Sequence, residues 1–203
     1  MKIYELGPAP SARRVSIFLA EIGIDVERQQ VDIRGGENLS ETFRAISLNG
    51  QIPVLELDDG TTICESVAIC RYFDEAFPTE QSLFGNSALE KAQIEMWQRL
   101  VELRGLLVAM QAFRNISGIY QDRENCITAW GEESRQRLVD FLPTLEKQLS
   151  KTTYVAGDSF SIADITAVIL CDFMKNLEIH IDENLPNLQR WYQLVSARPS
   201  VKS

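Results

Sequence analysis

Polar and apolar residues follow a strand pattern at the start of the chain and a helical pattern after it. Residues 2–6 predict a short strand, and a cluster of turn-forming residues follows at 7–10. Apolar residues then recur at the spacing of one helix face, which ends before a glycine: Val15, Phe18, Leu19 and Ile22. The chain therefore begins with a strand, a loop and a helix.

The same region continues with a second strand, a short helix and a hairpin. Residues 26–33 predict a strand, and Asn38 with a glutamate three positions later predicts a capped helix start. A third strand begins after Pro53, where a missing N–H is tolerated, and turn residues 58–60 lead into a fourth. A last helical pattern ends at Pro78, so the region predicts the order βαβαββα.

Beyond this region only helical periods occur. Residues 79–87 are polar and contain glycine, which predicts a linker between one domain at 1–78 and an all-helical domain at 88–203. The apolar pattern predicts a long helix that begins near Ile94 and runs past Met110. Further helices are expected at residues 138–149, after a capping box formed by Ser161 and Asp164, and at residues 188–195.

Composition excludes several classes of function. The chain is 45% apolar and 24% charged, as in folded soluble proteins, and its net charge of -9 repels phosphate backbones and anionic lipids. We therefore expect no nucleic-acid and no membrane partner. No secretory signal pattern or membrane-length apolar stretch occurs, and the four cysteines form no CxxC, which predicts reduced thiols in the cytoplasm.

A single histidine restricts the available chemistry. His180 lies near the C-terminal end between two isoleucines, so a serine triad, a Cys–His pair or a multi-histidine metal site would depend on it alone. We interpret His180 as structural or exposed, and we expect no metal site. The sequence also lacks both glycine-rich phosphate-binding loops, GxGxxG and GxxxxGK[ST].

Four motifs resemble those of the cytosolic glutathione transferases, in the family's order and over nearly the whole chain. Three lie early, at residues 10–15 (Pro-Ser-Ala-Arg-Arg-Val), 50–55 and 58–66, and the fourth spans residues 156–164. The chain is similar to bacterial members, with nu-like and fungal-like features at the start of its first helix. The resemblance implies a thioredoxin-like α/β N-terminal domain followed by an all-α C-terminal domain.

The resemblance also implies a glutathione site in the first domain. It implies a cis bond between Ile52 and Pro53, with the Ile52 backbone paired to the cysteinyl part of glutathione. Glu65 and Ser66 correspond to the residues that hold the γ-glutamyl end, and Gln51 is a candidate for the glycyl end. From the residues alone, Ser66 would be predicted only as a helix N-cap.

The chemistry of this family requires glutathione as a thiolate, and Ser11 is the candidate that stabilises it. A charge-assisted hydrogen bond at a helix N-terminus contributes about 1.5–3 kcal/mol, or about one to two pKa units. The slot that holds the catalytic Ser or Cys in several classes falls on Ala9, and Ser11 lies where nu-like and some fungal members carry Asn. The alternative role for Ser11 is an N-cap; Tyr4 lies within the strand and is not favoured.

Two arginines follow Ser11 in the first turns of this helix. Arg13 and Arg14 oppose the helix dipole there, so they are expected to be compensated. They either pair with acids across a domain or dimer interface or help to attract an anionic tripeptide.

Candidate residues for the second substrate lie where the long helix meets an irregular segment expected at residues 111–124. They are Phe113, Arg114, Ser117 and Tyr120. The family resemblance implies a homodimer and no prosthetic group, with glutathione and a small electrophile as the two substrates.

The function implied is transfer of glutathione to a small electrophile. Two alternatives keep the same fold. One is glutathione-dependent reduction of disulfides or peroxides, and the other is non-catalytic glutathione binding or an interaction module.

Overall fold

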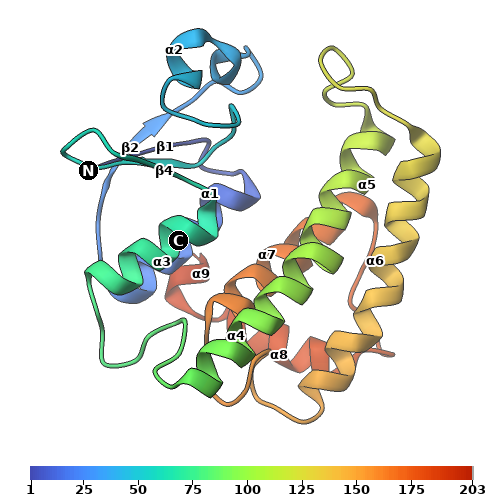
Figure 1. Cartoon of the computed structure of the whole chain (residues 1–203). Helices are drawn as coiled ribbons and strands as arrows, with labels where there is room; N and C mark the ends of the chain where they lie inside the picture. The colour runs from blue at the N-terminus through green and yellow to red at the C-terminus, as the bar shows by residue number, and fades with distance from the viewer. Residues whose placement is uncertain (203) are drawn as a thin grey trace. The chain divides into compact units, whose positions relative to one another are not determined.

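A computed structural model of the protein describes residues 1–202, which form two compact units. Met1–Ser82 is an α/β unit with a four-stranded sheet, and Leu83–Lys202 is a helical unit (Figure 1). The predicted fold class, an α/β domain with the order βαβαββα followed by helices, is confirmed. The exact extent of the linker at residues 79–87 stays a prediction.

The sheet of the α/β unit is mixed. Its strands are β1 (Lys2–Glu5), β2 (Glu27–Gln30), β3 (Val54–Glu56) and β4 (Thr62–Cys64), in the spatial order β2-β1-β3-β4. β2 pairs with β1 in parallel, whereas β3 is antiparallel to both β1 and β4. The predicted hairpin is therefore present, and β2 is shorter than the predicted 26–33.

Helices cover both faces of this sheet. Figure 1 shows α1 (Pro10–Ile22) and α3 (Ser66–Ala76) on one side and the short α2 (Glu41–Arg44) on the other. Alternation along β1 and β3 divides the core between the two faces. Tyr4 packs edge-on against Phe43 on the α2 side, and Ile3 and Leu55, which are paired and fully buried, point to the opposite face.

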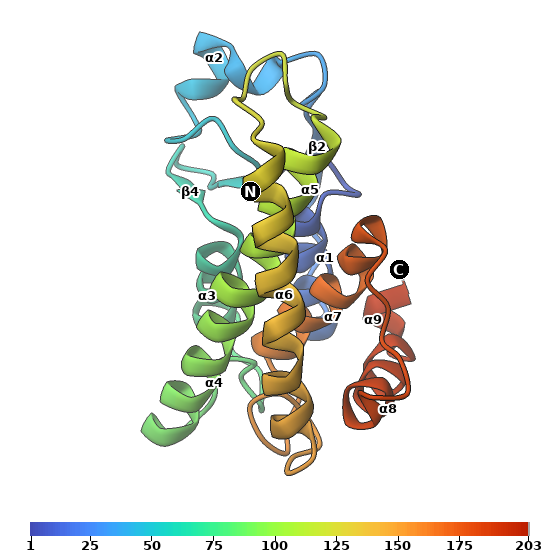
Figure 2. The same ribbon diagram turned by 90° about the vertical axis from the view of Figure 1, so that its right-hand side faces the viewer.

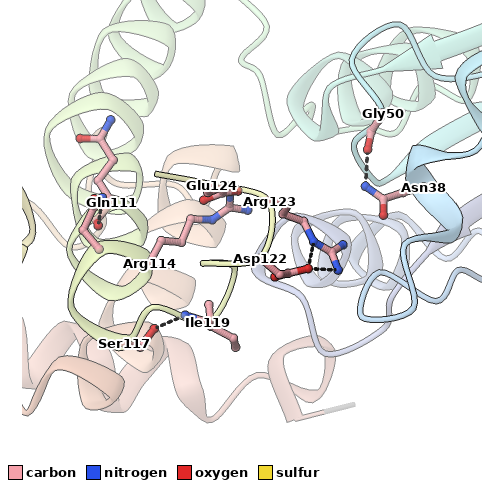
Figure 3. A network of polar contacts seen from close by, with 10 residues as sticks. Asn38, Gly50, Gln111, Arg114, Ser117, Ile119, Asp122, Arg123 and Glu124 are labelled. Carbon is pink, nitrogen blue, oxygen red and sulfur yellow. Dashed lines mark hydrogen bonds and ion pairs between the residues drawn. The ribbon is translucent and has the colours of Figure 1, made fainter. Parts of the chain in front are cut away.

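The predicted start of α2 at Asn38 is wrong. Ser40 is the N-cap of this helix, and its hydroxyl accepts the Phe43 N–H at 3.2 Å. The Asn38 side chain instead donates to the Gly50 carbonyl at 2.7 Å, as Figure 3 shows. Polar residues follow Asn38 whether or not a helix begins there. The local sequence pattern therefore did not reveal that its side chain binds Gly50, which is distant in the sequence.

The helical unit is built around α7. Its elements are α4 (Ala88–Val101), a π-helical segment (Glu102–Leu106), α5 (Leu107–Ser117), α6 (Thr128–Leu149), α7 (Ile162–Met174), a 3-10 turn (Lys175–Leu177), α8 (Pro186–Ser196) and α9 (Pro199–Lys202). Residues 161–171 are all buried. In both views α5 runs beside α6, and α7 contacts both α4 and α8 (Figure 2).

The predicted long helix extends from Ala88 to Ser117 and contains a wider π-helical turn at residues 102–106. Gly105 lies in this turn, where an added Cβ would come within 2.5 Å of Leu170 on α7 and 3.3 Å of Phe141 on α6. The absence of a side chain therefore lets the three helices approach closely at this point.

Asp164 holds the start of α7 in place. The predicted capping box with Ser161 is present, and the carboxylate also accepts the Val155 N–H and the Trp191 indole N–H at 2.9 and 2.8 Å. Complete burial raises the pKa of Asp164 to about 6, and these hydrogen bonds act in the opposite direction. One buried carboxylate thus joins α7, the loop before it and α8.

Candidate functional site

The loop that precedes β3 is held in shape by two buried or half-buried polar side chains. Ser47, which is 1% exposed, donates its hydroxyl hydrogen to the Gln51 carbonyl at 2.9 Å, and its oxygen accepts the Gln51 N–H at 3.1 Å. Asn38 fixes the Gly50 carbonyl from the other side. Gly50 has a φ of 63°, which a residue with a side chain rarely adopts. The loop therefore presents Gln51 and Ile52 in one conformation.

The chain leaves this loop through a cis bond between Ile52 and Pro53, as the family resemblance implies. The β3 ladder begins at Val54, so the backbone of Ile52 lies just beyond the paired residues of the sheet. An extended peptide paired with the Ile52 backbone, beyond the end of the ladder, would continue the pattern of strand pairing.

Glu65 links β4 to α3 in an unusual backbone conformation. Its φ is 69° and its ψ is 116°, outside the regions that residues with a Cβ prefer, which costs on the order of 1–3 kcal/mol. The exposed Glu65 carboxylate accepts a hydrogen bond from the Asn49 side chain at 3.1 Å. The side-chain oxygen of Asn49 (Oδ1) in turn accepts the Gln51 N–H at 3.1 Å. Asn49 therefore joins Gln51 and Glu65.

Ser66 is the first residue of α3 and is 4% exposed. Its oxygen accepts a hydrogen bond from the Arg14 guanidinium at 2.7 Å, and both residues are buried. A hydroxyl carries one hydrogen and two lone pairs, whereas arginine has no acceptor. The contact with Arg14 therefore uses a lone pair of Ser66 and leaves its hydrogen available to an acceptor.

Ser11 lies at the start of α1, on the same face as Arg14 three residues later. The N-cap of α1 is Ala9 and the first helical residue is Pro10, so the alternative role of Ser11 as N-cap is wrong. Ser11 is half-buried, and within residues 1–202 its hydroxyl makes no hydrogen bond. Because α1 packs against α3, Ser11 and Ser66 begin two neighbouring helices.

The two helices that carry these serines begin without side-chain caps. Neither α1 nor α3 has a capping side chain or an acidic residue in its first turn. In the helical unit, by contrast, α4 and α7 begin with capping boxes, and Glu146 accepts the N–H groups of Asn187 and Leu188 at the start of α8. The uncapped N–H groups and positive dipole ends of α1 and α3 favour an anionic ligand.

The cysteines fall into two classes of exposure. Cys70 and Cys171 are buried, and burial raises the pKa of Cys70 to about 12 and also raises that of Cys171. These two thiols are protonated at neutral pH, so neither supplies a nucleophile. Cys64 and Cys126 are half-buried and also free.

The candidates for the second substrate lie at the end of α5. Arg114 is paired with Glu124 (Figure 3), and the Arg114 guanidinium lies 4.9 Å from the centre of the Tyr120 ring. Ser117 accepts the Ile119 N–H in the same turn. Phe113 instead packs edge-on against Phe173 of α7, with ring centres 5.5 Å apart. The structure thus brings Arg114 and Tyr120 together, places Ser117 at the end of α5, and directs Phe113 toward a neighbouring helix.

Three residues that organise the site were not among the sequence candidates: Arg14, Ser47 and Asn49. Arg14 was predicted to pair with an acid or attract an anion, and nothing local indicated that it would bind the Ser66 hydroxyl 52 positions away. Ser47 and Asn49 form loop contacts that have no sequence signature. Tyr4, which was not favoured, donates its hydroxyl to Glu56 at 2.6 Å.

No helix within residues 1–202 is long and apolar enough to cross a membrane. No group of three or more His, Cys, Asp or Glu side chains in that same stretch is arranged to hold a metal ion.

Comparison with known proteins identifies both parts of the chain. The model of the glutathione S-transferase N-terminal domain matches residues 9–76, and that of the C-terminal domain matches residues 130–199. Glutathione S-transferase 2 of Saccharomyces cerevisiae is 34% identical, with 100% of this chain and 88% of the relative covered.

Solved structures agree over the full length. A glutathione S-transferase of class Gtt2 from Vibrio parahaemolyticus is 56% identical, with a TM-score of 0.90 over 100% of this chain and 96% of its own. Gtt2 from Saccharomyces cerevisiae is 34% identical, with a TM-score of 0.94 over 100% and 99% of the two chains. The chain belongs to the glutathione S-transferase family.

Proposed function

We propose that the α/β unit binds glutathione at the starts of α1 and α3 and that the protein transfers it to small electrophilic molecules. The observation that carries this proposal is the Ser66 hydroxyl. Its oxygen is engaged by the buried Arg14, its hydrogen is left for an acceptor, and it begins an uncapped helix. A carboxylate satisfies all three conditions, because it accepts from the hydroxyl and from helical N–H groups and is favoured by the nearby cation.

Each part of the tripeptide has a partner in this arrangement. Ser66 receives the γ-glutamyl carboxylate, and the Glu65 carboxylate receives the amino group beside it. The Ile52 backbone, turned outward by the bond to Pro53, pairs with the cysteinyl residue as an added strand would. Gln51, held by Ser47 and Asn49, lies next along the loop and contacts the glycyl end.

The reacting sulfur lies at the start of α1 in this proposal. The Ser11 hydroxyl donates to the glutathione sulfur, and the helix dipole adds to the stabilisation, so the thiol loses its proton to water near neutral pH. The thiolate then forms a carbon–sulfur bond with the electrophile while the leaving group departs with its bonding electrons. The buried thiols take no part, since burial raises the pKa of Cys70 to about 12.

The electrophile is proposed to contact Phe113, Arg114, Ser117 and Tyr120. The cationic Arg114 beside the Tyr120 ring favours aromatic compounds that carry a polar or electron-poor substituent. We also propose that the protein works in the cytoplasm as a homodimer, in line with its family, with no prosthetic group and no nucleic-acid or membrane partner.

Replacing Ser11 by alanine tests the stabilisation of the sulfur. Loss of a charge-assisted hydrogen bond should raise the pKa of bound glutathione by about one to two units. Ultraviolet absorbance of the thiolate, followed against pH, measures this pKa. Ser16→Ala is the matched control, because Ser16 lies on the same helix and donates only to the Ala12 carbonyl. Identical titrations of the wild type and Ser11→Ala would refute the assignment.

A double-mutant cycle tests whether Arg14 acts through Ser66. Ser66→Ala should weaken glutathione binding by about tenfold or more, and Arg14→Lys should weaken it in the wild type, because the ammonium cannot keep the same contact. In the Ser66→Ala background the effect of Arg14→Lys should largely disappear. Calorimetric titration with glutathione measures all four affinities, with Arg13→Lys as the control. Equal losses in both backgrounds would show that Arg14 does not act through Ser66.

Turnover of matched substrates separates transfer from the two alternative functions. We expect the protein with glutathione to convert 1-chloro-2,4-dinitrobenzene faster than a glutathione mixed disulfide or a hydroperoxide, because the proposed site activates the glutathione sulfur itself for attack on carbon. Faster disulfide or peroxide reduction would favour the reductase. Glutathione binding without turnover of any of the three would favour a non-catalytic role.

A further inference from the structure

The side-chain amide of Asn49 lies between the two residues that are proposed to bind opposite ends of glutathione. Its nitrogen Nδ2 donates to the Glu65 carboxylate at 3.1 Å, and its oxygen Oδ1 accepts the Gln51 N–H at 3.1 Å. Gln51 is two positions from Asn49 in the sequence, whereas Glu65 is 16 positions away. One side chain therefore connects the loop before β3 with the residue that precedes α3.

An amide is the group that suits both of these partners. The backbone N–H of Gln51 donates and cannot accept, and an ionised carboxylate accepts and cannot donate. Asn49 therefore has one orientation, with its oxygen toward Gln51 and its nitrogen toward Glu65. The Ser47 hydroxyl lies 3.3 Å from the same oxygen and favours this orientation too. An alanine would serve neither partner, and an aspartate would set a second carboxylate against Glu65.

Both partners of Asn49 keep polar groups for a ligand. Glu65 and Gln51 are exposed. Within residues 1–202 the Glu65 carboxylate has one hydrogen bond, from Asn49 to the oxygen Oε1, and the side-chain amide of Gln51 has none. The second oxygen of Glu65 and the Gln51 amide therefore remain available to the two ends of the tripeptide.

Asn49 can transmit an effect between these two ends. Its side chain is exposed, so hydrogen bonds hold it in place more than packing does. Ordering an exposed side chain costs conformational entropy. A ligand that engages Glu65 bears this cost once, and its other end then meets a Gln51 whose N–H is already held by an ordered Asn49. Binding at each end therefore favours binding at the other.

We propose that Asn49 is a positioning residue that couples recognition of the γ-glutamyl amino group to recognition of the glycyl end of glutathione. This inference rests on the proposed glutathione site and adds a source of selectivity to it. Asn49 acts through Glu65 and Gln51 and does not itself contact the ligand. The coupling makes the site favour the complete tripeptide over ligands that carry one of its two ends.

Four ligands measured on the full-length protein test the coupling. They are glutathione, γ-glutamylcysteine without the glycine, glutaryl-cysteinylglycine without the amino group, and glutaryl-cysteine without both. Calorimetric titration gives the affinities, and weak ligands are measured by competition with glutathione. In the wild type, loss of the glycine should weaken binding about fivefold more when the amino group is present than when it is absent.

Two variants separate coupling from loop structure. Asn49→Ala should weaken glutathione binding and reduce the coupling to less than about twofold. Asn38→Ala is the matched control, because Asn38 holds the same loop through Gly50 at 2.7 Å and has no hydrogen bond to Glu65 within residues 1–202. It should weaken all four ligands by a similar factor and leave the coupling at about fivefold. A merely structural role of Asn49 would make the two variants behave alike.

Two results would overturn the role of Asn49 while the proposed glutathione site stands. One is that the losses of the amino group and the glycine are independent in the wild type, and the other is that the coupling persists in Asn49→Ala. Removal of either group without any effect on wild-type affinity would instead contradict the proposed glutathione site, and the role of Asn49 with it.

Discussion

The buried hydrogen bond from Arg14 to Ser66 is the contact on which the site of the α/β unit depends. It joins α1 to α3 at the point where α3 begins, and it places a permanent cation behind an uncapped helix. Burying a guanidinium is costly unless it is hydrogen-bonded, so the contact constrains how the two helices pack. It also determines which part of the Ser66 hydroxyl remains for a ligand, since the oxygen is engaged and the hydrogen is not.

The starts of α1 and α3 lack the side-chain caps that α4, α7 and α8 have. In the helical unit the N–H groups at the starts of α4, α7 and α8 are bound by Glu90 with Ser87, by Ser161 with Asp164, and by Glu146. Such caps stabilise the helix and leave fewer N–H donors for another molecule. In the α/β unit α1 and α3 lack this stabilisation. Glu65, the residue before α3, also has a strained backbone conformation. Unmet donors and strain in one location are typical of a binding site.

Much of the fold could be predicted from the sequence because its signals are local. Apolar periods located the main helices, and the spacing of Ser161 and Asp164 predicted a capping box that the structure contains. Predictions were less accurate where distant residues decide the outcome. Asn38 binds Gly50 instead of starting α2, and the π-helical turn contains Gly105 at the point where a side chain would clash with Leu170 of α7.

The candidate site also contains some residues that the sequence identified and others that it did not. Ile52, Glu65 and Ser66 were identified through motifs that resemble those of the family, and the structure places Glu65 and Ser66 at the start of α3 as expected. Arg14 lies inside one of those motifs, but its partner is 52 residues away and no periodicity connects them. Ser47 and Asn49 shape the loop through side-chain contacts to its backbone, which depend on a turn that sequence patterns do not specify.

The central claim is that the start of α3 and the Ser66 hydroxyl receive a carboxylate of glutathione. Calorimetric comparison of glutathione with an analogue whose γ-glutamyl α-carboxylate is converted to an amide tests this claim most directly. The account predicts that the amide binds the wild-type protein at least tenfold more weakly and that this difference shrinks markedly in Ser66→Ala. Equal affinities of the wild type for the two ligands would contradict it.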